Sequence, residues 1–93
     1  MSRPRFSVVH SRRYETRLAE LYVEHHEISA ALNELEPMLR SIPDQIGILF
    51  EWQGGEYWYV SYKCVEILYR IMADDCQVQL HYISWRLDGG GHA

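Results

Sequence analysis

The fold is decided by the segment Val65-Glu-Ile-Leu-Tyr-Arg-Ile-Met72, Ala73-Asp-Asp-Cys76, Gln77-Val-Gln-Leu-His-Tyr-Ile-Ser-Trp85. Two runs rich in β-branched and aromatic residues flank an acidic turn, and this pattern predicts two antiparallel strands. Residue types alternate in the second run, so we expect one set of side chains on each face of the sheet. The two sets are Val78, Leu80 and Tyr82 on one face, and Gln77, Gln79 and His81 on the other.

Two more strands are expected before this segment. Residues 46–52 place Ile46, Ile48, Phe50 and Trp52 at every second position. Gln53-Gly-Gly55 is a hairpin turn signal, and the strand pattern resumes over residues 56–62. These runs together predict a three- to four-stranded antiparallel meander.

The first half of the chain predicts a short strand and two helices. Residues 5–10 have strand character, and Ser11 offers an N-cap for the helix that follows. Apolar side chains then recur at spacings of three, four and seven, which defines one buried face for each helix. They are Tyr14, Leu18, Leu21, Tyr22 and His25 in the first helix, and Ile28, Ala31, Leu32, Leu35, Met38, Leu39 and Ile42 in the second.

Proline 37 falls inside the second helical pattern. A proline removes a backbone donor and crowds the preceding turn, so we expect a break or kink there. Pro37 would then be the first residue of a short extra turn.

The order of elements predicts an α+β protein with one domain over residues 1–88 and a flexible glycine-rich tail over residues 89–93. An N-terminal strand precedes a helical hairpin, and the hairpin covers one face of the meander. The opposite face is left to solvent or to a partner.

The composition limits the classes of function. With 93 residues, 47% of them hydrophobic, the chain has enough apolar material for one core, and disorder is excluded for most of its length. No signal peptide or membrane span is visible, and the two cysteines, Cys64 and Cys76, are predicted to lie too far apart to bond. We therefore expect a cytoplasmic protein with reduced thiols.

The charge leaves two kinds of partner open. The net charge is −4, Lys63 is the one lysine, and five of the eight arginines fall in the first seventeen residues. Acidic residues concentrate between Glu20 and Glu36. Such a surface could repel nucleic acid, which is bound through cations, or attract a basic partner.

The order and spacing of these pieces resemble the RelE/ParE toxins of bacterial toxin–antitoxin systems. The resemblance spans roughly residues 6–86 and includes a junction, Ser41-Ile-Pro-Asp-Gln-Ile-Gly47, ahead of the meander. It also includes the segment quoted first, with its tyrosine, acidic turn and valine-containing last strand. Where such toxins often begin a strand with Tyr-Arg, this chain has Val65-Glu66, and the lysines that often precede the sheet are missing.

The resemblance implies the toxin component of a type II toxin–antitoxin pair, which a cognate antitoxin neutralises, with a role such as plasmid stabilisation. Family activities are ribosome-dependent cleavage of mRNA and inhibition of DNA gyrase, so the ribosome, mRNA or gyrase is the implied target. Catalysis in the RNA-cleaving members uses cations and proton-transfer groups, and no cofactor or metal is implied. Whether this chain is an endoribonuclease stays open, because the basic positions are only partly filled.

Four residues are candidates for catalysis. Arg86 matches a family position that often holds a functional arginine, and Arg70 and Lys63 could complete a phosphate cradle with it. The alternative is that these cations pair with acids such as Glu66 or Asp88. His81 could serve as a general base, with an ordinary pKa near ~6.5, or be a surface residue.

The rival hypothesis is a non-catalytic protein-binding module on a degenerate toxin fold. The strands carry many aromatic residues, which could stack on bases or be covered by a protein partner. They include Tyr57, Trp58, Tyr59, Tyr62, Tyr82 and Trp85. The acidic character of the chain, with a net charge of −4, and Glu66 favour this rival.

Overall fold

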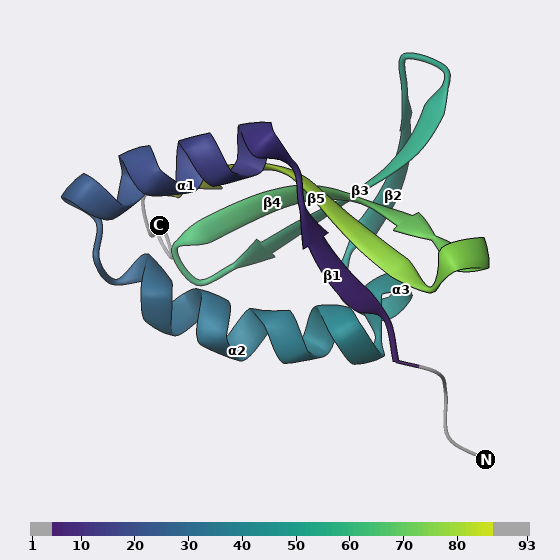
Figure 1. The fold of residues 1–93 in the computed structure, drawn as a ribbon, viewed down its shortest axis with the longest axis horizontal. Helices are drawn as coiled ribbons and strands as arrows, with labels where there is room; N and C mark the ends of the chain where they lie inside the picture. Colours follow the sequence, from purple (N-terminus) through teal and green to yellow (C-terminus); the bar gives the residue numbers. More distant parts are fainter. Residues whose placement is uncertain (1–4, 87–93) are drawn as a thin grey trace.

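The computed structural model describes residues 5–86, and within them the α+β prediction is confirmed (Figure 1). The predicted tail, residues 89–93, lies outside the described residues. The elements are β1 (Ser7–His10), α1 (Arg12–Glu24), α2 (Ile28–Ser41), α3 (Pro43–Ile46), β2 (Ile48–Trp52), β3 (Gly55–Tyr62), β4 (Val65–Met72), a 3-10 turn (Ala73–Asp75) and β5 (Gln77–Trp85).

These strands form one five-stranded sheet in the order β1-β5-β4-β3-β2. Strands β2 to β5 are the predicted antiparallel meander, whereas β1 pairs with β5 in parallel at the other edge. Gln53 and Gly54 both have positive φ, as a two-residue hairpin turn between β2 and β3 requires.

The helices and one face of the sheet enclose a single core. Figure 1 shows α1 and α2 running in opposite directions, joined at one end by a short connection. The core-facing side chains of α1 are Tyr14 and Leu21, with Leu18 partly buried, while Tyr22 is 38% exposed and does not belong to the buried face. From α2 the core receives Ile28, Ala31, Leu32, Leu35 and Leu39, and from the sheet it receives Val60, Val65, Ile67, Tyr69, Val78, Leu80 and Ile83.

The predicted break at Pro37 is wrong. Helix α2 continues without interruption from Ile28 to Ser41, with Pro37 on its exposed side. A proline inside a helix costs about 3 kcal/mol, but Leu35 before it and Leu39 after it are almost completely buried. Burying side chains on both sides of the proline offsets that cost, and the proline that begins a helix is Pro43 in α3.

The prediction for the last strand is wrong from Tyr82 onward. Leu80 pairs with Tyr69 and Tyr82 pairs with Leu68, so His81 is an extra residue and forms a β-bulge. The bulge shifts the alternation by one position. Tyr82 therefore faces away from the core, and Ile83 takes the buried position opposite Ile67.

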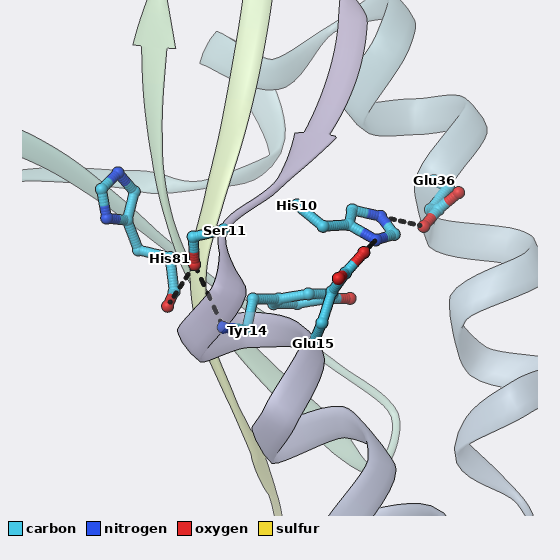
Figure 2. A network of polar contacts seen from close by, with 6 residues as sticks. All are labelled: His10, Ser11, Tyr14, Glu15, Glu36 and His81. Carbon is cyan, nitrogen blue, oxygen red and sulfur yellow. Dashed lines mark hydrogen bonds and ion pairs between the residues drawn. The ribbon is translucent and has the colours of Figure 1, made fainter.

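The bulge is also where β1 ends and α1 begins. The Ser11 amide donates to the Leu80 carbonyl at 3.0 Å, and the Ser11 hydroxyl donates to the His81 carbonyl at 3.2 Å (Figure 2). The same hydroxyl accepts from the Tyr14 amide at 3.0 Å, which confirms Ser11 as the N-cap. One serine thus joins the start of α1 to the bulged part of β5.

His10 connects the two helices at this junction. Its ring lies between the carboxylates of Glu15 in α1 and Glu36 in α2, with Nδ1–O and Nε2–O distances of 3.7 and 3.4 Å (Figure 2). The ring also packs on Tyr14, with 4.8 Å between centroids. Burial of Tyr14 and the nearby Glu36 carboxylate raise the pKa of its hydroxyl well above the usual value, so this hydroxyl stays protonated.

The junction before the sheet is held by a close approach between Gly47 and Tyr69. The buried Tyr69 hydroxyl donates to the Pro43 carbonyl at 2.7 Å. A Cβ atom at Gly47 would overlap the Tyr69 hydroxyl oxygen and would also lie tightly against the Tyr59 carbonyl. Glycine is needed here for space rather than for a positive φ.

We predict that Gly47→Ala destabilises the protein by about 1–3 kcal/mol through overpacking. Tyr69→Phe costs about 1–3 kcal/mol because the Pro43 carbonyl loses its buried donor. The double variant should be less destabilised than the sum of the two, because Phe removes the oxygen with which the new methyl group overlaps. Urea unfolding measures all three, with Gly55→Ala as the matched control, since a Cβ there meets only ordinary contacts. Additive effects in the double variant would contradict this explanation.

Candidate functional site

The face of the sheet turned away from the helices carries the candidate site. Residues directly opposite each other in an antiparallel pair share a face, so the register assigns one row across four strands. That row is Ile48, Tyr59, Leu68 and Tyr82. Arg70, Glu66, Tyr57 and Ser61 belong to the same face because they lie an even number of positions from this row.

Arg70, Tyr57 and His81 form a cluster on this open face. The Arg70 guanidinium carbon lies 5.2 Å from the Tyr57 ring centroid, and its Nε donates to the Glu56 carbonyl at 3.3 Å. The Tyr57 ring contacts the His81 ring edge-on, with 5.6 Å between centroids. Two of the four sequence candidates, one from β4 and one from β5, are thus brought together around a tyrosine.

His81 lines a hollow of about 290 Å³ beside this cluster. The other lining residues are Ser11, Arg13, Trp52, Tyr57, Leu68 and Tyr82. The His81 Nε2 atom is buried and has no hydrogen-bond partner among residues 5–86. Burial first, and then the positive charge of Arg70, lower the pKa of His81 below its usual value. The ring is therefore neutral at pH 7 and able to accept a proton.

Arg86 lies at the opposite end of the open face. Its guanidinium donates to the Ser61 hydroxyl, and its Nε lies 3.9 Å from a Glu66 carboxylate oxygen. Glu66 and Arg70 are four positions apart along β4, which is about 13 Å of strand. Arg86 therefore pairs with the acid considered in the alternative interpretation, while Asp88 lies outside the described residues.

Lys63 does not join the other candidates. It occupies the turn between β3 and β4, and its Nζ lies 2.7 Å from a Glu34 carboxylate oxygen on α2. The Tyr62 hydroxyl donates to the same oxygen at 2.7 Å. The hydrogen bond to Glu34 raises the pKa of Lys63. Of the two alternatives, a cradle of Arg70, Arg86 and Lys63 is therefore not assembled in this structure.

A group of arginines that we did not single out as site residues lies beside the open face. Arg12, Arg13 and Arg17 of α1 line a groove of about 610 Å³ together with Thr16, Glu20 and Tyr82. The Arg13 guanidinium carbon lies 5.1 Å from the Tyr82 ring centroid. The crowding of arginines at the start of the chain was the sequence signal for this groove. Its position became visible only with the bulge that turns Tyr82 outward.

Three other sequence features have a structural outcome. Within residues 5–86 no group of three or more His, Cys, Asp or Glu side chains is placed to hold a metal ion. Cys64 and Cys76 lie at opposite ends of β4, and the Cys64 carbonyl accepts from the Arg86 amide at 2.7 Å. No described helix has the length and apolar character needed to span a membrane.

The comparisons with known proteins agree with this architecture. No protein-family model matches the chain, and no curated protein matches its sequence. A solved structure that does match is the RelBE2 toxin–antitoxin complex from Mycobacterium tuberculosis, with a TM-score of 0.76. The match covers 91% of this chain and 95% of the other, at 20% sequence identity. The chain therefore has a RelE-like fold, and at this identity the likeness establishes the fold alone.

The cluster of Arg70, Tyr57 and His81 leads to a testable prediction about the pKa of His81. Because the positive charge of Arg70 lowers the pKa of His81, Arg70→Gln should raise that pKa toward ~6.5. Histidine ring resonances followed by NMR between pH 5 and 8 measure the value in each variant. Arg5→Gln, which removes the same charge from an exposed position at the start of the chain, is the control. An unchanged or lower His81 pKa in Arg70→Gln would show that the two side chains do not interact.

The depressed pKa also fixes the sign of a stability effect. The unfolded chain holds the His81 proton more tightly than the folded chain does, so this residue makes stability fall as the pH drops through ~6.5. His81→Gln should therefore lose less stability than the parent between pH 7.5 and 5.5. Urea midpoints at the two pH values test the difference.

Proposed function

We propose that this protein is the toxin component of a type II toxin–antitoxin system, acts in the cytoplasm and is held inactive by a cognate antitoxin. The observation that carries the proposal is the RelE-like fold over nearly the whole described chain, matched to a toxin–antitoxin complex. The open sheet face adds support. It carries the unpartnered His81 Nε2 atom and the rings of Tyr57 and Tyr82.

The activity that the open face supports best is cleavage of mRNA on the ribosome. In this mechanism the RNA 2′-hydroxyl attacks the adjacent phosphorus atom and its proton passes to the neutral His81. The 5′-oxygen leaves and takes a proton from water, which yields a 2′,3′-cyclic phosphate. Arg70, whose guanidinium lies near the same hollow, stabilises the negative charge that builds on the phosphate.

A second candidate function is a non-catalytic binding module or a toxin directed at DNA gyrase. The observation that favours it is the neutralisation of two cations: Glu66 accompanies Arg86, and Glu34 accompanies Lys63. An enzyme acting on phosphate gains least from cations that already have carboxylate neighbours. Exposed apolar side chains on the edge strand β2, Ile48, Leu49 and Trp52, would suit a protein partner.

Inducing the chain alone in a bacterial host, with mapping of transcript ends, distinguishes these functions. We expect growth arrest and new mRNA ends inside codons. Arg70→Ala and His81→Gln should reduce cleavage by about 10²-fold or more, because general acid–base and electrostatic terms are of that size. Arg86→Ala should have a smaller effect, since Glu66 already balances its charge.

Arg40→Ala, in the last turn of α2, is the matched control and should retain full arrest. Arrest without new ends would move the target to gyrase or another protein. Absence of arrest at well-folded expression levels would refute the toxin proposal in that host and leave the binding module. Co-purification with the product of an adjacent small open reading frame tests the antitoxin partner separately.

A further inference from the structure

The basic groove on α1 and the aromatic hollow on the sheet are parts of one continuous surface. The groove is lined by Arg12, Arg13, Thr16, Arg17, Glu20 and Tyr82, and the hollow adds Ser11, Trp52, Tyr57, Leu68 and His81. Arg13 and Tyr82 line both, so the two depressions meet where the Arg13 guanidinium lies over the Tyr82 ring. Ser11 fixes this meeting point because it caps α1 and bonds the bulge at His81.

The cations of this surface differ from those elsewhere in the chain. Within residues 5–86, neither Arg12 nor Arg13 has a carboxylate within ion-pair distance. Arg17, which also lines the groove, is paired with Glu20 at 3.2 Å. In a chain with a net charge of −4, two neighbouring guanidiniums without counter-charges mark a local site for an anion.

The aromatic side chains indicate which kind of anion fits. Trp52 and Tyr57 pack edge to face, with 5.3 Å between centroids, and Trp52 remains 45% exposed. The hollow of about 290 Å³ is at the lower end of the range for small-molecule sites. Aromatic rings beside arginine side chains are the combination that binds single-stranded nucleic acid, with bases on the rings and phosphates on the arginines. An acidic peptide would use the arginines and leave the rings without partners.

We propose that this surface binds single-stranded RNA, with successive phosphates along the α1 groove on Arg12 and Arg13 and one base in the hollow against Trp52. The inference rests on the proposed function for its biological setting. In that function the phosphate to be cleaved lies beside His81, and the rest of the RNA would continue from it along this surface. Arg12 and Arg13 are binding residues in this arrangement and take no part in proton transfer. They would add affinity that the partly neutralised cations of the open face do not provide.

The test measures fluorescence anisotropy of a labelled twelve-nucleotide single-stranded RNA with the purified chain, between 50 and 200 mM salt. Arg12→Gln/Arg13→Gln should bind about tenfold or more weakly at the lowest salt. Its plot of log affinity against log salt should be shallower by about 1.4, since each phosphate contact to a single strand contributes about 0.7. Trp52→Ala should bind about fivefold or more weakly, whereas Trp52→Phe should keep most of the affinity.

The control double variant is Arg5→Gln/Arg40→Gln, which makes the same change in net charge. Arg5 precedes β1, and Arg40 of α2 lies close to it because the Phe6 amide donates to the Arg40 carbonyl. The groove begins beyond the other end of β1, at Arg12. This control should bind RNA as the parent does. Equal loss in both double variants would mean that only net charge matters, and would overturn the proposed site.

Absence of RNA binding at 50 mM salt, or equal binding of polyglutamate with the same dependence on Arg12 and Arg13, would overturn the RNA site.

Two further outcomes separate this inference from the proposed function. Growth arrest by a chain without RNA affinity would leave the toxin function standing without this surface. RNA binding through the groove without growth arrest would support the site and remove the toxin function.

Discussion

The rest of the structure depends on the contact between Ser11 and the bulged part of β5. Its amide and hydroxyl bond the carbonyls of Leu80 and His81, and the same hydroxyl caps α1. This arrangement ends the parallel pairing of β1 with β5 and starts the helix beside the continuing strand. It also fixes the outward orientation of Tyr82, on which Arg13 packs. The fold and both depressions of the candidate surface therefore share one hydrogen-bonded junction.

The balance of charges differs between the parts of the candidate surface. Of the four residues first considered for catalysis, Lys63 and Arg86 have carboxylates nearby, whereas Arg70 packs on Tyr57 beside a neutral His81. Arg12 and Arg13 have no carboxylate within ion-pair distance in the described part of the chain. At exposed positions such an ion pair adds little to stability. The carboxylate nevertheless cancels most of the attraction that the cation would exert on an approaching anion. If the proposed function holds, we therefore expect the RNA phosphates on the α1 side of the open face.

The spacing of apolar residues predicted most of the fold, because the buried face of a helix or strand recurs with the period of that element. The apolar positions of α2 are buried or partly buried as expected, and four strands form the meander. Periodicity failed where one local event outweighed it. A proline was accommodated because the turns around it are buried, and an extra residue in β5 reversed the alternation after His81. Neither event has a local signature in the sequence.

The sequence by itself determined most of the helices and strands, the cap at Ser11 and the types of residue available for chemistry. These follow from interactions within a few residues or from the burial pattern of one element. Only the tertiary structure decided which cations meet. Lys63 finds Glu34 across 29 positions, and Arg13 finds Tyr82 across 69. Such pairings depend on strand register and on how helices cross the sheet, and both are set by packing of the whole core rather than by neighbouring residues.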